Sequence, residues 1–232
     1  IAAGSFGYFI ITVNTHSAAT SGNTIKIDGL VNPVTFGYTT VPTITNNQTD
    51  IADLQTILAA GVALTTSAIA AANIAQGSTN NIVYAVRMDV TSFPVTVNSI
   101  QFTLTGTFDA NDLTTINIYF NATTASVAGA QALHLNESAL FASGHTYNIA
   151  SFNNSGPKLV AAGTSGYFLI TATVHSAGTT GNTIKLDAAA NPAIFGYTSS
   201  PTITNNQTDI AGTQTILAAG VTLSTSAIAA AN

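Results

Sequence analysis

The stretch Ile82-Val-Tyr-Ala-Val-Arg-Met-Asp-Val90 carries a large apolar side chain at every even position. A period of two residues is that of a β-strand with one buried face. The same period recurs in residues 99–105, 116–121 and 167–174. These four stretches predict strands, and they decide the fold class of the chain.

Shorter strands are expected between them, because turn sequences such as Asn153-Asn-Ser-Gly-Pro157 separate brief apolar runs. Residues 109–113 could form one helical turn capped by Asp109. The Ala-rich stretch 66–73 fits either a short helix or an extended linker. About seven to nine strands in one unit predict an all-β, antiparallel β-sandwich of immunoglobulin-like type. The shorter strands are expected around residues 133–135, 145–150, 182–187, 193–197 and 214–218.

An internal repeat organises the chain. Residues 4–73 align without a gap with residues 163–232 at an offset of 159, and 50 of the 70 pairs are identical. Residues 74–162 have no second copy in this sequence. We therefore expect the chain to be one part of a longer tandem array of repeats.

The repeat predicts a division into two units. Residues 1–73 would be the C-terminal part of one unit, an incomplete sandwich with its linker. Residues 74–232 would be one complete unit, with a sandwich core at about 80–218 and a linker at 219–232.

Composition excludes several classes of function. Only 6% of the residues are charged, with four Lys/Arg, nine Asp/Glu and a net charge of -5, against roughly 25% charged residues in ordinary domains. So few basic residues leave no surface for nucleic acid. No apolar run approaches the roughly 20 residues of a membrane-spanning helix, so no membrane insertion is expected. With no cysteine, disulfides and thiolate sites are excluded.

Few residues could support catalysis. Glu137 is the one Glu of the chain, and no Gly-x-Ser-x-Gly motif is present. His16 and His175 are copies of one repeat position, and we expect each to bond a loop carbonyl at a strand end. His134 and His145 would meet if residues 133–135 and 145–150 paired as a hairpin, which alone makes a poor metal site. We therefore predict no enzyme activity and no cofactor.

A weak cation candidate is the cluster Asp109, Asn111 and Asp112. Hard cations take six to eight oxygen ligands, and this cluster supplies three side chains. The simpler interpretation is an Asx turn, in which Asp109 accepts hydrogen bonds from nearby backbone N–H groups.

Several motifs resemble one family. They are Asn73-Ile-Ala-Gln-Gly-Ser-Thr-Asn-Asn-Ile-Val83, residues 99–113 and Gly163-Thr-Ser-Gly-Tyr-Phe-Leu-Ile-Thr-Ala172. They resemble the immunoglobulin-like tandem repeats of giant, type-IX-secreted cell-surface adhesins and gliding-motility filament proteins of Bacteroidota. The resemblance covers essentially the whole unit. It implies a stalk or filament of β-sandwiches, exported to the cell surface and used in adhesion, spreading or gliding.

The favoured function is thus a structural repeat module of a long extracellular filament or adhesin stalk. Its partners would be neighbouring repeats of the same chain or identical subunits. A first alternative is a lectin-like module that binds surface polysaccharide through exposed Tyr8, Tyr119, Tyr147 or Tyr167. A second is a filament or pilus subunit assembled by strand donation. Packing between repeats is expected at the apolar residues of the linkers, which are Ile57, Leu58, Val62, Leu64, Ile69, Ile216, Leu217, Val221, Leu223 and Ile228.

Overall fold

The structure is a computed structural model that divides into two compact units, Ile1–Ala59 and Ala60–Asn232. The residues that the structure describes are 1, 4–16, 19–27, 32–40, 42–49, 53–138, 140–186, 190–208 and 212–220.

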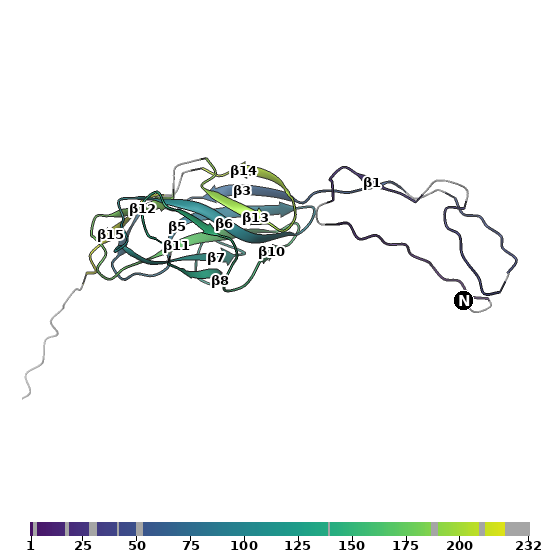
Figure 1. The fold of residues 1–232 in the computed structure, drawn as a ribbon, viewed down its shortest axis with the longest axis horizontal. Helices are drawn as coiled ribbons and strands as arrows, with labels where there is room; N and C mark the ends of the chain where they lie inside the picture. Colours follow the sequence, from purple (N-terminus) through teal and green to yellow (C-terminus); the bar gives the residue numbers. More distant parts are fainter. Residues whose placement is uncertain are drawn as a thin grey trace, which may run out of the picture. The chain divides into compact units, whose positions relative to one another are not determined.

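The second unit is a β-sandwich, and its first layer is a six-stranded sheet (Figure 1). Strands β5, β11, β7 and β8 of this sheet pair antiparallel, whereas β14 pairs parallel to β3. In spatial order the sheet contains β14 (Thr202–Asn206), β3 (Gly61–Ser67), β5 (Asn81–Thr91), β11 (Ser165–Val174), β7 (Leu113–Asn121) and β8 (Gln131–Glu137).

The second layer is a seven-stranded sheet built around one long strand, β6, which pairs with four others. Its edge pair, β15 with β4, is again parallel. The sheet contains β10 (Lys158–Val160), β6 (Val95–Gly106), β12 (Thr183–Leu186), β15 (Gln214–Leu217), β4 (Ala72–Ala75), β13 (Ala193–Tyr197) and β9 (Thr146–Ile149).

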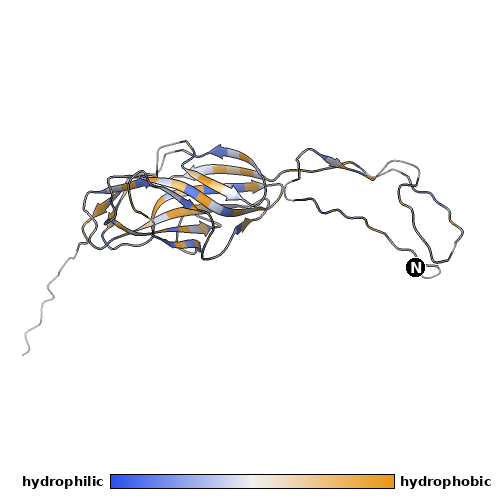
Figure 2. Cartoon of the chain, in the orientation of Figure 1, coloured by the Kyte–Doolittle hydropathy of each residue, from blue (hydrophilic) through white to orange (hydrophobic). Residues whose placement is uncertain are grey.

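The two sheets enclose one apolar core, and orange and blue residues alternate along several of its strands (Figure 2). Phe168 is fully buried at its centre, with the rings of Phe120 and Phe195 centred 5.1 and 5.0 Å away. Each stretch with a two-residue period forms a strand, so the all-β sandwich is confirmed. No helix among the described residues is long and apolar enough to cross a membrane.

The sandwich begins earlier in the sequence than the repeat suggested. The second compact unit starts at Ala60, whereas the expected boundary fell after Asn73. Residues 61–67 and 72–75, which we expected in a linker, form β3 and β4 instead. The physical reason is burial, since Val62 and Leu64 are each 2% exposed in the core.

The first unit contains one pair of two-residue strands, β1 (Thr24–Ile25) and β2 (Gln55–Thr56). It repeats the local contacts of the second copy. Gln48 bonds both backbone groups of Val34 at 3.1 and 2.9 Å, as Gln207 does for Ala193 at 3.2 and 2.7 Å. Local hydrogen bonds thus survive in a stretch where most apolar side chains are exposed.

Candidate functional site

The candidate site is the junction segment, residues 60–76, where the end of one repeat copy enters the sandwich of the next. Strand β3 lies between β5 and β14, antiparallel to the first and parallel to the second. Thr202 N donates to Ala60 O over 2.8 Å at the start of this pairing. The β3 part of the junction segment is therefore paired on both sides within the six-stranded sheet.

Side chains fix the far end of β3. Thr66 Oγ1 lies 2.6 Å from the hydroxyl of buried Tyr84, and either atom could donate. Thr66 Oγ1 also donates to Thr208 O, and Thr208 N donates back to it, each over 2.8 Å. These bonds join residues separated by 142 positions in the sequence, so they hold β3 and the end of β14 together.

After β3 the junction segment crosses from one sheet to the other. Gln214 Nε2 donates to Ala70 O over 3.0 Å, and Gly212 N donates to Ile69 O over 2.6 Å. Beyond the crossing, β4 pairs with β15, and Gln76 N donates to Leu217 O over 2.9 Å. One continuous segment thereby contributes a strand to each layer of the sandwich.

The close approach at Gly212 predicts that Gly212→Asp destabilises the second unit. An added Cβ would lie 2.0 Å from Ala71 N, which is backbone and cannot rotate away. We expect a loss of about 2–4 kcal/mol in the free energy of unfolding, measured by urea denaturation of the full chain.

Gly220→Asp is the matched control for this substitution, because no described atom lies within 4 Å of an added Cβ there. Its unfolding midpoint should equal that of the unsubstituted chain. Equal midpoints for the two variants would show that the crossing segment does not pack on Gly212.

The residues expected at the junction fall into three groups. Val62, Leu64 and Ile216 are buried within the sandwich itself. Ile57 and Ile69 are half-buried, and Leu58 and Leu217 are exposed. Residues outside the described part of the chain are Val221, Leu223 and Ile228.

Asp112 of the cation candidate is a hydrogen-bond acceptor that ties two loops together. Its carboxylate accepts from Thr179 N, Asn182 Nδ2 and Asp109 N at 2.5, 2.7 and 2.9 Å. Burial alone would raise the pKa of Asp112, but these three donors outweigh it and lower the pKa below its ordinary value. The carboxylate is thus already surrounded by N–H groups.

Asp109 forms the Asx turn that the sequence favoured, because its Oδ1 accepts from Asn111 N over 2.7 Å. Asp109 and Asn111 are both exposed. Among the described residues there is no group of three His, Cys, Asp or Glu side chains that could hold a metal ion.

The histidines differ from expectation in two respects. The hairpin that would join His134 to His145 does not form, because β8 pairs with β7 in one sheet and β9 pairs with β6 in the other. His134 Nε2 instead lies 3.2 Å from Glu137 Oε2. His175 uses Nδ1 to accept a hydrogen bond from Ala177 N over 3.0 Å, whereas a bond to a carbonyl was expected.

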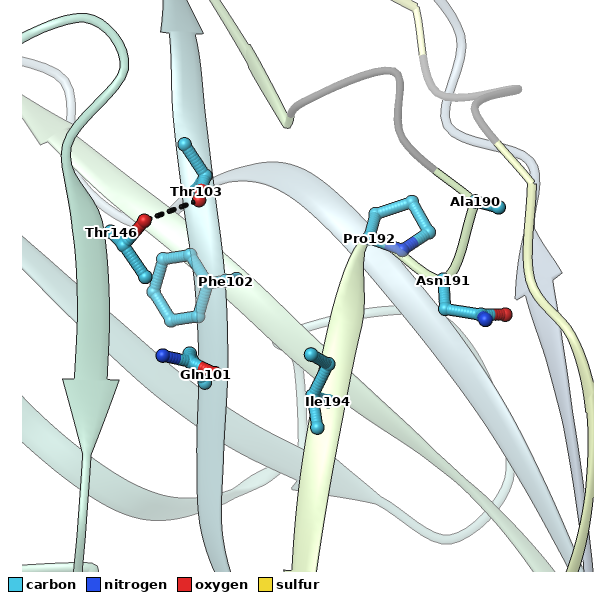
Figure 3. A pocket seen from close by; sticks show the side chains of 8 residues that line it. All are labelled: Gln101, Phe102, Thr103, Thr146, Ala190, Asn191, Pro192 and Ile194. Carbon is cyan, nitrogen blue, oxygen red and sulfur yellow. Dashed lines mark hydrogen bonds between the residues drawn. The ribbon is translucent and has the colours of Figure 1, made fainter.

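A groove of about 310 Å³ lies over β6, β9 and β13 (Figure 3). Phe102 is the aromatic residue in its described lining, but that ring is 2% exposed and stacks on buried Tyr147. Of the tyrosines considered for sugar stacking, Tyr147 is buried, so the prediction that it is exposed is wrong. Tyr119 and Tyr167 are half-buried, and Tyr8 in the first unit is 86% exposed. Tyr119 also donates its hydroxyl to Asn80 Oδ1 over 2.9 Å. This groove offers no exposed aromatic face.

Comparisons with known proteins assign this chain to no family. No family model matches the chain, and no curated protein does. A chain from the crystal structure of a CaDoc0917–CaCohA2 complex is 15% identical, with 68% of this chain and 99% of that chain covered and a TM-score of 0.27. The seventh ScaB type I cohesin from Pseudobacteroides cellulosolvens is 14% identical, with coverages of 71% and 97% and a TM-score of 0.29. Such values establish neither a family nor a function.

Proposed function

We propose that this chain is a structural repeat module of a long extracellular filament or adhesin stalk. The observation that carries the proposal is the junction segment. Residues 61–73 close the first copy of the repeated sequence, yet they form β3 and the first half of β4 in the following sandwich. Consecutive units built this way are joined through strands and need no free linker between them.

The chemistry of the surface supports a structural role. The chain has 6% charged residues, and its one Glu, Glu137, lies beside His134. The stability of a stack of such units is the sum of the stability of each unit and of each interface between neighbours, as in other repeat proteins. We further propose that the filament is exported by type IX secretion and serves in adhesion or gliding.

The expected result is that native material made of this sequence has an intact mass far above 23.5 kDa under denaturing conditions. Antibodies against the purified chain should also label intact source cells at their surface, and brief protease treatment should remove that label. Label that appears only after cell lysis would contradict an extracellular filament.

The intact mass also distinguishes one giant polypeptide from the alternative of separate subunits joined by strand donation. Residues 220–226 repeat five of the seven residues of Gly61–Ser67, so a second copy of the β3 sequence follows β15. A filament that dissociates into pieces of 23.5 kDa would refute one giant polypeptide and favour subunits that donate this segment.

A further inference from the structure

We propose that Ile1–Ala59 is half of a sandwich whose missing half has the sequence of residues 60–162, supplied by another copy of the repeat. This deepens the proposed function, because it names the partner of an exposed surface. The surface consists of the strand sequence Tyr8-Phe-Ile-Ile-Thr-Val13, which copies Tyr167-Phe-Leu-Ile-Thr-Ala172 of β11.

Exposure distinguishes the two copies of this strand. Phe9 is 69% exposed and Ile11 is 62% exposed, whereas their counterparts Phe168 and Ile170 are at most 1% exposed. In the second unit β11 lies between β5 and β7, with Phe168 opposite Phe120 and Ile170 opposite Ile118. The first unit has the apolar side chains of a central strand without the two neighbouring strands, and leaving such a row exposed is unfavourable.

Glycine positions indicate which partner fits. An added Cβ at Gly166 would lie 2.2 Å from Cζ of Phe120, so the glycine gives room to this ring. The first copy keeps the glycine as Gly7, where Ile1 is the only described residue within 4 Å of the added Cβ. A partner strand with the sequence of β7 would place a phenylalanine over Gly7.

Polar groups indicate the same partner. Thr179 N and Asn182 Nδ2 donate to the buried carboxylate of Asp112, which lies in the part of the repeat that occurs once in this chain. The first copy keeps both residues as Thr20 and Asn23, which are exposed. A partner with the sequence of residues 60–162 would bring the matching carboxylate.

The first unit has an open pocket at positions that are packed in the second unit. This pocket of about 510 Å³ is lined by Phe36 and Tyr38 among others, and both side chains are exposed. Their counterparts Phe195 and Tyr197 pack on the core of the second unit. One position differs between the two copies in a way that affects packing. In the second unit Gly212 lies too close to Ala71 to leave room for a Cβ, and the first unit has Asp53 at the equivalent position. We therefore expect the crossing segment of the added half to shift there.

The experiment joins residues 60–162 directly ahead of Gly4, which recreates the connection between Ala162 and Gly163. Hydrogen exchange is then followed by mass spectrometry in the extended and the original chains. Peptides over Gly4–Val13 and Gly163–Ala172 differ in sequence and report separately. We expect amides of Tyr8–Val13 to exchange at least about 100-fold more slowly in the extended chain, and binding of an apolar dye to fall.

Two further readouts keep the test decisive. In an extended chain that carries Asp112→Ala in the added segment, the amides of Tyr8–Val13 should exchange faster than in the unsubstituted extended chain. The exchange rates of Gly163–Ala172 should stay the same. The proposal is overturned if the amides of Tyr8–Val13 exchange as fast in the unsubstituted extended chain as in the original chain, while those of β11 exchange slowly in both. This test uses purified chains alone, so it can fail while the native material still proves to be a surface filament, and the reverse also holds.

Discussion

A chain of residues 76–218 should lose cooperative unfolding, whereas a chain of residues 60–218 should retain it. The shorter chain lacks β3 and β4, including buried Val62 and Leu64. Removing one buried aliphatic side chain alone costs about 2–5 kcal/mol. Loss of both, together with exposed edges on β5 and β14, should exceed about 5 kcal/mol, which is comparable to the whole stability of a small domain.

Calorimetry and urea denaturation measure this difference. Both chains end at residue 218, so neither can use residues 220–226 as a substitute for β3. The chain of residues 60–218 is the matched control, because it lacks the first unit and keeps the junction segment. A sharp transition of equal midpoint in both chains would place the start of the unit after Asn73, as the repeat alone suggested.

Asp112→Ala should destabilise the second unit by about 3–5 kcal/mol. The substitution leaves Thr179 N, Asn182 Nδ2 and Asp109 N without their buried acceptor. Two loops that are about 70 positions apart in the sequence then lose their common anchor. Asp109→Asn is the control, because Asp109 is exposed and accepts one hydrogen bond, so about 1 kcal/mol or less is expected.

The lowered pKa of Asp112 adds a dependence on pH. A carboxyl group whose pKa is lower in the folded state contributes its full stability above its unfolded pKa, about 3.9. That contribution is lost as the pH falls through the folded-state pKa. The stability difference between the unsubstituted chain and Asp112→Asn should therefore shrink below about pH 4, measured by urea denaturation at a series of pH values. A difference that stays constant down to about pH 2 would show that folding does not lower the pKa of Asp112.

Strands that alternate strictly were predictable, and polar or Ala-rich strands were not. Residues 82–90 show most of their buried face in the sequence, because the alternating apolar side chains contact the core from Tyr84 to Val90. The exception is the start of β5, where Val83 is buried and Ile82 is half-buried. Buried and half-buried residues also alternate at the start of β3, where Val62 and Leu64 point into the core. Its Ala and Thr residues weaken this pattern in the sequence, so we predicted a linker there. Every residue of the edge strand β14 is exposed, so it has no apolar pattern to find.

The candidate site was harder to predict than the fold. The repeat marks where a sequence recurs, but the boundary of a folding unit depends on which strands share a core. Only the pairing of β3 with β5 and β14 shows that the sandwich starts at Ala60. Likewise, the partners of Asp112 come from a loop that is distant in sequence, so the short-range spacing predicted the Asx turn at Asp109 but not this contact.

The parallel pairing of β4 with β15 has a mechanical consequence. Once β3 has left the other sheet, tension along the chain would pull β4 from its N-terminal end and β15 from its C-terminal end. Because the two strands run in the same direction, this load slides them past each other and strains their hydrogen bonds together. In an antiparallel edge pair the same load would peel the bonds apart one at a time. The edge pair β4–β15 of the second sandwich would therefore resist stretching by shear, a geometry in which several hydrogen bonds bear the load at once.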